Sequence, residues 1–290
     1  MSFLLAWLSR RSLRLLHALG ALLGWAAYLL SPSYRRRLKG NADLAGLGAA
    51  ERHASVGEAG KLVMELPRLW LRPAAEPVND PVRWEGAELI EAVLDAGKGL
   101  VLLTPHMGSF EICAQAYAQR FGARQPITVL YRPARQAWLR ELEETARARP
   151  ALATAPANLA GVRQMMRALR KGETLGLLPD QVPPDGMGVW APFFGQPAYT
   201  MTLAARLALQ NDAGVCLIWG DRLPQGAGYV VRVQPLAAPL PAKGQMDEDS
   251  WMTAAATVIN QSMEVLIRAR PQQYLWGYDR YKQPRRLGGP

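Results

Sequence analysis

The segment GLVLLTPHMGSFE places a histidine and a glutamate at the point where an apolar run ends. The chain has only three histidines, and one of them, His106, is followed five positions later by Glu111. Pro105 and Gly108 prevent a helix from running through the histidine, and Ser109 is a suitable N-cap for a helix that begins directly after it. A turn that leads into a helix lets the carboxylate accept the imidazole Nδ1–H, which leaves Nε2 as a base. We therefore predict that His106 and Glu111 are catalytic.

Three further predicted strands also end in polar side chains. These are Arg132 after 127–131, Asp180 and Gln181 after 174–179, and Asp221 and Arg222 after 214–220. In an open α/β sheet, ligands bind beyond the carboxyl ends of the strands, where the loops meet. A lone histidine and glutamate at this spacing are more often a turn residue and a helix-dipole partner. Their place beside other polar strand ends favours the catalytic interpretation.

Metal and cysteine chemistry fit the sequence less well. The other histidines, His17 and His53, lie in the N-terminal helical region, and no cluster of ligands has zinc-like spacing. Cys113 lies in a predicted helix between Ile112 and Ala114, which favours a packing role over that of a nucleophile. The two cysteines lie in apolar runs, as expected for a reducing compartment. We expect no metal and no cofactor.

Short apolar strands alternate with helical stretches over most of the chain. The predicted strands cover 99–104, 127–131, 174–179, 214–220 and 229–236, and the predicted helices cover 109–121, 136–149, 159–172 and 202–211. Strand, helix, strand at this spacing indicates parallel pairing, whereas the Gly-rich turn before the last strand indicates antiparallel pairing with the fourth. We predict an α/β fold with a mostly parallel central sheet and helices on both faces. Upstream, residues 41–80 are predicted to be helical with a break at Pro67.

The N-terminal segment combines a hydrophobic stretch with basic flanks. Residues 15–30 are nearly free of polar groups, although a membrane-spanning helix needs about 20 apolar residues. Residues 1–40 carry seven Lys and Arg and no Asp or Glu, which is most of the net charge of +10. A helix in, or dipping into, the anionic cytoplasmic leaflet explains both features better than a buried core helix or a cleaved signal peptide. We predict a membrane anchor over 1–40 and a single α/β domain over 41–290.

The positive net charge raises the alternative of a nucleic-acid-binding protein. Proteins that bind single-stranded nucleic acid interleave aromatic and basic side chains on an exposed surface. In this sequence the aromatic residues lie mostly in apolar runs, and the positive charge concentrates beside the hydrophobic segment. We therefore expect anionic membrane lipids as partners, and no nucleic acid.

Six motifs occur in a fixed order along the chain. They are VMELPRLW, TPHMGSFE, YRP, LPDQ, APFFGQPAYT and PQQYLWGYDRYKQPRR, and with the N-terminal hydrophobic helix they cover nearly the whole chain. This set resembles the bacterial lipid A biosynthesis acyltransferase family of H-x4-(D/E) membrane acyltransferases. H-x4-E alone is a weak signal, whereas the ordered set is specific. The resemblance implies a glycerol-phosphate-acyltransferase-like fold.

The resemblance also implies a reaction. A fatty acyl chain would move from acyl-acyl carrier protein to a hydroxyl on a 3-hydroxyacyl chain of a phosphorylated lipid A precursor, at the cytoplasmic face of the bacterial inner membrane. His106 would be the general base, oriented by Glu111, and the activated thioester makes a covalent acyl-enzyme unnecessary. Alternatives are another lipid acceptor, such as a glycerophosphate or a phosphoinositide mannoside, or acyl-CoA as the donor. A catalytically inactive membrane scaffold is a separate possibility.

Several other residues are candidates for substrate binding. Arg132, or backbone N–H groups near Gly108, would suit the tetrahedral oxyanion. Asp180 and Gln181 would position the sugar or the hydroxyl, with the capping of a turn as the structural alternative. Arg163 would contact a phosphate or else belong to a solvated helix face.

Two further groups suit the acyl chain and the charged partners. Gly195 would let an acyl chain approach closely beside Trp190, Phe193 and Phe194, although core packing is an equal alternative for these aromatic residues. The closing basic residues, Arg280, Lys282, Arg285 and Arg286, would suit phosphate head groups or an acidic carrier protein. A plain solvated tail is the structural alternative.

Overall fold

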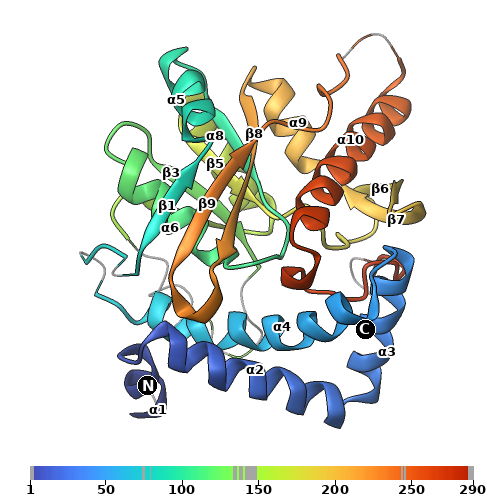
Figure 1. The fold of residues 1–290 in the computed structure, drawn as a ribbon. Coiled ribbons are helices and arrows are strands. Elements are labelled where there is room, and N and C mark those ends of the chain that lie inside the picture. Colours follow the sequence, from blue (N-terminus) through green and yellow to red (C-terminus); the bar gives the residue numbers. More distant parts are fainter. Residues whose placement is uncertain are drawn as a thin grey trace.

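The computed structural model describes residues 3–73, 76–78, 80–132, 136, 140, 149–242, 244 and 246–286. In this part of the chain, a seven-stranded sheet has the order β1-β9-β8-β2-β5-β3-β4 (Figure 1). The strands are β1 (Val82–Glu85), β2 (Leu100–Leu103), β3 (Ile127–Tyr131), β4 (Leu152–Pro156), β5 (Thr174–Leu177), β8 (Gly214–Arg222) and β9 (Tyr229–Gln234). β9 and β1 run opposite to the other strands, which are all parallel. The prediction of a mostly parallel sheet is confirmed.

The buried strands were predicted, whereas two strands at the edges of the sheet were not. The predicted strands correspond to β2, β3, β5, β8 and β9, and β9 is antiparallel to β8 as expected. β1 alternates between half-buried and exposed side chains, and β4 has the sequence LATAP. Neither has the continuous apolar run that marks a strand buried on both faces.

Helices cover both faces of the sheet. One face carries α5 (Ala87–Asp95) and α6 (Phe110–Phe121), and the other carries α8 (Leu159–Arg170), α9 (Leu203–Gln210) and α10 (Glu248–Ala269). Successive side chains of β2 alternate between the two cores, as the period of two in a strand requires. The helix predicted over 136–149 lies almost wholly outside the described residues.

An antiparallel hairpin packs against α10. It consists of β6 (Gly188–Phe193) and β7 (Gln196–Met201). Its turn is formed by Phe194 and Gly195, whose φ angles are 47° and 73°. A Cβ added at Gly195 would meet nothing within 4 Å, so this glycine serves the turn and not a close approach. Phe193 and Phe194 are buried in the core, which is the alternative of core packing raised above.

Four helices precede the sheet. They are α1 (Phe3–Ser9), α2 (Leu13–Leu30), α3 (Pro32–Leu44) and α4 (Ala49–Trp70). α4 lies across the carboxyl edge of the sheet, and α2 runs alongside it (Figure 1). The predicted break at Pro67 is wrong, because α4 continues through it to Trp70. A proline in the last turn gives up one N–H bond, and its carbonyl still accepts from Leu71 N–H.

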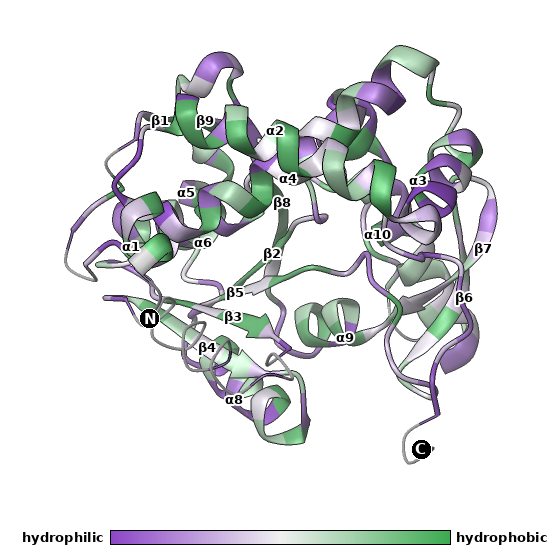
Figure 2. Ribbon diagram, turned by 90° about the horizontal axis from the view of Figure 1, so that it is seen from below, coloured by the Kyte–Doolittle hydropathy of each residue, from purple (hydrophilic) through white to green (hydrophobic). Residues whose placement is uncertain are grey.

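α2 and α4 lie so close together that glycine is required between them. A Cβ added to Gly60 would lie 1.9 Å from the carbonyl oxygen of Gly20, and one added to Gly24 would lie 2.1 Å from that of Val56. The other face of α2 is apolar and exposed, with Leu15, Leu22, Leu23, Trp25, Leu29 and Leu30 (Figure 2). Among the described residues, α2 is the one helix long and apolar enough to cross a membrane.

Candidate functional site

The site lies where the carboxyl ends of β2 and β5 meet. β2 leads into residues 104–109, called here the His106 turn, and β5 leads into Asp180 and Gln181. β2 and β5 are parallel neighbours, so the polar residues that follow them arrive side by side at one edge. β3 and β8 end at the same edge and bring Arg132 and Arg222 toward it.

Both ring nitrogens of His106 have a hydrogen-bond partner. Nδ1 lies 2.7 Å from Oδ1 of Asp180, and the backbone N–H of His106 donates to Oδ2 of the same carboxylate at 2.9 Å. The side-chain nitrogen of Gln181 lies 3.0 Å from Nε2. This pattern fits a neutral imidazole that donates from Nδ1 and accepts at Nε2. The basic lone pair is therefore on Nε2, covered by the amide of Gln181.

Asp180, and not Glu111, accepts the hydrogen bond at Nδ1, which corrects the expected pairing. Glu111 lies in the first turn of α6, as predicted, and its Oε2 accepts from Nε1 of Trp70 at 3.2 Å. His106 and Glu111 line the same cavity. The sequence spacing had suggested Glu111 because the two residues are near in the chain. The pairing with Asp180 arises because β5 lies directly beside β2.

Asp180 is an ionised carboxylate behind the imidazole. Its side chain is 2% exposed. Burial by itself raises the pKa of Asp180, but the imidazolium form of His106, through its charge and hydrogen bonds, and the charge of Arg280 outweigh it and hold the pKa below its ordinary value. A buried carboxylate at this position fixes the tautomer and the orientation of the histidine.

Hydrogen bonds from separate segments hold the backbone of the His106 turn. The carbonyl of His106 accepts from Leu275 N–H at 3.0 Å, and Gly108 N–H donates to the carbonyl of Gln273 at 2.9 Å. Ser109 N–H donates to the carbonyl of Gly220 at 2.8 Å. The N–H groups at Gly108 and Ser109 are thus engaged within the fold. These two N–H groups are therefore not available for an oxyanion, which corrects the expectation for Gly108 itself.

A buried ionic network supports the turn from the side of α4. Arg222 donates from Nη2 to the carbonyl of Gly108 at 2.9 Å, and it contacts Glu65 through Nε at 3.1 Å and Nη2 at 3.0 Å. Its Nη1 donates to Glu58 at 2.7 Å. Nε2 of His17, on α2, lies 3.3 Å from Glu65. The network therefore connects α2 and α4 to the turn that carries His106.

Glu65 is the functional-site residue that the sequence reasoning missed. It is fully buried, and burial raises its pKa, but the charge of Arg222 and the bond from His17 outweigh burial and lower it below the ordinary value. The signal in the sequence is a carboxylate at a buried position within the apolar spacing of VMELPRLW. A charge at such a position needs a buried partner of opposite sign.

A cavity of about 660 Å³ opens beside His106 and Gln181. Its walls are largely apolar and come from α6, β3, the start of α8 and the segment after β5, with Phe110, Ala114, Val129, Leu130, Leu159, Val162, Leu178, Val182 and Met187. Arg132 also lines it, while its side chain is exposed. The volume lies within the range of small-molecule sites, which are mostly apolar with a few polar groups.

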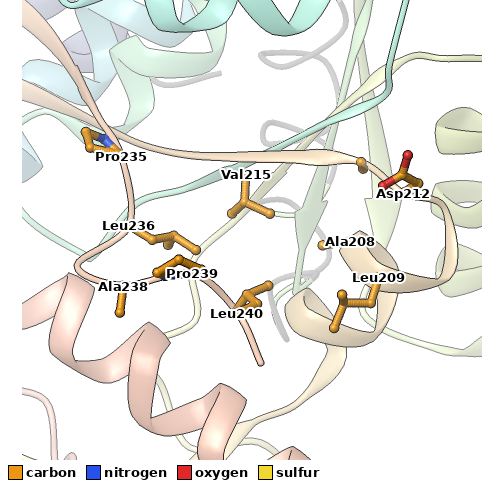
Figure 3. A pocket seen from close by; sticks show the side chains of 10 residues that line it. Ala208, Leu209, Asp212, Val215, Pro235, Leu236, Ala238, Pro239 and Leu240 are labelled. Carbon is orange, nitrogen blue, oxygen red and sulfur yellow. The ribbon is translucent and has the colours of Figure 1, made fainter. Parts of the chain in front are cut away.

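A second hollow lies at the opposite end of the sheet. It has a volume of about 390 Å³ and is lined by residues of α9, the start of β8 and the segment after β9 (Figure 3). Asp212 is the single titratable side chain on its wall, and the labelled neighbours are apolar. Because β8 runs from this hollow toward the His106 edge, the two cavities are at opposite ends of the strand.

Some predicted binding residues lie away from the cavity. Arg163 is exposed on α8, and Gly195 is in the β6–β7 turn; neither lines the cavity. Arg280 is 2% exposed, and its guanidinium donates to the carbonyl of Tyr199 and to Oγ1 of Thr200, both at 2.8 Å. Arg280 is therefore a buried structural residue and not part of a basic surface, which corrects the expectation for the C-terminal run.

The cysteines are packing residues. Cys113 and Cys216 are free and buried. Burial raises the pKa of Cys216 to about 11 and that of Cys113 further above its ordinary value. Thiols of this kind are poor nucleophiles near neutral pH. Over the residues that the structure describes, no three His, Cys, Asp or Glu side chains are grouped as metal ligands would be.

Comparison with known proteins shows which family the chain belongs to. The profile of the bacterial lipid A biosynthesis acyltransferases matches residues 4–283. A lipid A biosynthesis lauroyltransferase of Escherichia coli (strain K12) is 27% identical over 204 residues, which cover 69% of this chain and 62% of the relative. A lipid A biosynthesis palmitoleoyltransferase of the same strain and a lipid A biosynthesis acyltransferase of Shigella flexneri are each 26% identical over 234 residues, which cover 80% of this chain and 71% of each relative. The match thus spans less than two thirds of the lauroyltransferase.

Proposed function

Because this chain belongs to the bacterial lipid A biosynthesis acyltransferase family, we propose that it moves a fatty acyl chain from acyl-acyl carrier protein to a hydroxyl of a 3-hydroxyacyl chain on a lipid A precursor. The observation that carries the proposal is the imidazole of His106, bonded at Nδ1 to the buried Asp180 and placed on the wall of an apolar cavity. A base beside an apolar cavity suits a reaction whose two substrates both carry acyl chains.

His106 acts as the general base in this mechanism. The acceptor hydroxyl replaces the amide of Gln181 at Nε2, and its proton passes to Nε2 as its oxygen attacks the thioester carbonyl carbon. Asp180 stabilises the imidazolium that forms. When the tetrahedral intermediate collapses, the C–S bond breaks and the imidazolium returns the proton to the leaving thiolate. Base catalysis of this kind contributes about 10²- to 10⁴-fold to the rate.

Two side chains are the proposed donors to the tetrahedral oxyanion. The amide of Gln181, once released from Nε2, remains beside the reacting atoms, since it starts 3.0 Å from the base. The guanidinium of Arg132 belongs to the same cavity. Donors placed where charge develops lower the barrier more than donors to the ground state. Glu111 adds a second carboxylate to the cavity wall.

The exposed face of α2 supports a position at the membrane surface. Leu22, Leu29 and Leu30 are 69%, 65% and 83% exposed. The helix has 18 residues, which span about 27 Å and fall short of a bilayer core of about 30 Å. Since its opposite face is packed on α4, we place α2 flat in the anionic cytoplasmic leaflet of the inner membrane, with the basic residues of the N-terminal segment near lipid phosphates.

His106→Ala tests the base assignment. We expect the rate of acyl transfer from the carrier thioester to the lipid A precursor to fall by about 10²- to 10⁴-fold, as measured by mass spectrometry of the lipid product. His53→Ala is a matched control, since His53 is exposed on α4 and outside the cavity; its rate should equal that of the parent. Thermal unfolding should be similar for both variants. A parental rate for His106→Ala would overturn the assignment.

A further inference from the structure

α8 is sharply divided into a buried apolar face and an exposed cationic face. Gly161, Met165, Ala168 and Leu169 are buried toward the sheet. The exposed residues Arg163, Arg167 and Arg170, together with Lys171 at the C-cap, form what we call the α8 cationic face. The spacing of the three arginines places them on one side of the helix.

The charges of the α8 cationic face are not neutralised by the described part of the chain. None of its four residues forms an ion pair there. By contrast, Arg120 pairs with Glu91 at 3.0 Å and Arg124 pairs with Asp95 at 2.6 Å on the opposite face of the sheet. Like charges along one helix face repel one another, so an anionic partner would be stabilising.

This face begins at the mouth of the cavity that lies beside His106. Asn158, Leu159 and Val162, at the start of α8, line that cavity. Arg163 is therefore next in sequence to a cavity residue, and the remaining cations continue away from it along the helix. A partner seated on the α8 cationic face would be adjacent to the cavity without filling it.

The α8 cationic face also differs from the membrane-facing side of the molecule. An interfacial helix exposes apolar side chains beside its cations, whereas the apolar residues of α8 beyond its first turn are turned toward the sheet. α2 packs on α4 across the carboxyl edge of the sheet, whereas α8 packs beside β3, β4 and β5, well apart from α2 (Figure 2). The chemistry of α8 therefore suits a folded acidic protein better than a bilayer.

We propose that the α8 cationic face docks the acidic carrier protein that delivers the acyl thioester. The inference rests on the proposed function, because it assumes that the donor is attached to a carrier. Carboxylates of the carrier pair with the arginines, and the thioester enters the cavity past the first turn of α8. Complementary charge of this kind sets the orientation and the association rate of a transient complex.

The test compares the parent, an α8 variant and a charge-matched control variant, each with two kinds of acyl donor. The variant R167Q/R170Q/K171Q neutralises three cations that lie farther from the cavity than Arg163. The control R120Q/R124Q/K98Q removes the same charge from cations elsewhere on the surface. Each is assayed with acyl carrier protein thioester and with acyl-pantetheine, which has the same thioester without the protein.

For the α8 variant, we expect KM for the carrier-linked donor to rise about ten-fold or more, with a weaker dependence on salt than in the parent. The kcat/KM of the α8 variant with acyl-pantetheine should equal that of the parent. The control variant should equal the parent both in KM for the carrier-linked donor and in kcat/KM with acyl-pantetheine. An unchanged KM of the α8 variant for the carrier-linked donor would overturn the proposal. So would an α8 variant that binds anionic vesicles less well than the parent but uses the carrier-linked donor normally.

Failure of the proposed function gives a different result. If the parent transfers no acyl group from either donor, the reaction assignment fails, and direct titration with the acidic carrier still decides the docking site. Binding that is lost in the α8 variant and kept in the control supports the docking surface. Equal binding by the parent, the variant and the control overturns it.

Discussion

At the scale of single residues, Asp180 and Gln181, the two hydrogen-bond partners of the His106 ring, have different effects on its chemistry. Asp180 accepts the hydrogen bond from Nδ1, which leaves the lone pair of the neutral imidazole on Nε2, the proposed base, and Gln181 covers Nε2 with its amide. A thioester beside an uncovered base is exposed to hydrolysis by water. We expect Gln181 to give way to the acceptor hydroxyl more readily than to water, because the lipid acceptor is held in place by its own binding energy.

Gln181→Ala should therefore change the balance between transfer and hydrolysis. Without the amide, water reaches Nε2, and an oxyanion donor is lost at the same time. We expect transfer to fall by about ten-fold or more, and the ratio of thioester hydrolysis to transfer to rise. Release of free thiol, followed with and without lipid acceptor, measures both quantities. A variant that transfers more slowly with an unchanged ratio would contradict the covering role.

The lowered pKa of Asp180 predicts how stability depends on pH. Its pKa in the folded chain is below the ordinary value of about 3.9, so its contribution to stability is fully present above that value and is lost as the pH falls through the folded pKa. Asp180→Asn lacks this contribution. The variant should be less stable than the parent at pH 6, and the gap should narrow toward pH 3, in denaturant titrations followed by tryptophan fluorescence. A gap that stays constant or widens toward acid would show that the pKa of Asp180 is not lowered by folding.

At the scale of secondary structure, α4 is the element that joins the N-terminal helices to the site. It contacts α2 through glycines, and it supplies Glu65 to Arg222, which in turn holds the carbonyl of Gly108. His17 of α2 completes this network at Glu65. The hydrophobic helix α2 is thus connected to the His106 turn through Glu65 and Arg222. A shift of α2 relative to α4 would therefore change the contacts that hold the turn.

Gly60→Ala tests the close contact between α2 and α4. The added methyl group would lie 1.9 Å from the carbonyl oxygen of Gly20, so the helices must separate. We expect a loss of about 1–3 kcal/mol in the free energy of unfolding, as for other overpacked sites. Gly40→Ala in α3 is the control, because nothing lies within 4 Å of its added Cβ. That change should be neutral or stabilise by up to about 1 kcal/mol. Similar values for the two variants would contradict the close packing.

At the scale of the whole molecule, the two proposed partners approach from different sides. The exposed apolar side chains of α1 and α2 suit a bilayer, and the α8 cationic face suits an acidic protein. α4 packs against α2 on one side and supports the His106 turn through Glu65 and Arg222 on the other. The two proposed binding sides would let a lipid acceptor and a carrier-linked donor reach one cavity at the same time, as the proposed direct transfer without an acyl-enzyme requires.

Leu22→Glu/Leu29→Glu tests the membrane-facing side. Each leucine that leaves an apolar environment costs about 1.5–3 kcal/mol, so the double variant should partition into anionic vesicles at least about 100-fold less well. Met246→Glu/Val265→Glu places the same charges on exposed apolar side chains elsewhere and should float with vesicles like the parent. Equal flotation of the two variants would show that α2 is not the membrane contact.

Features that depend on residues close together in the chain could be predicted from the sequence. The length of each apolar run predicted the buried strands, and the turn around Pro105 and Gly108 predicted the start of α6 at Ser109. The same local pattern correctly predicted that His106 follows the end of a strand. It did not recover β1 and β4, because their short, partly polar segments resemble loops. Glu65 was missed because its partner is far away in the chain.

Which side chains contact one another depends on the packing of the folded chain. Strand order placed β5 beside β2 and so brought Asp180 to Nδ1 of His106, whereas proximity in sequence had favoured Glu111. Folding likewise buried Arg280, although its basic neighbours suggested a surface. The physical reason is that helices and turns follow from short-range sterics and hydrogen bonds, while the order of strands follows from how whole helices pack to bury both faces of the sheet.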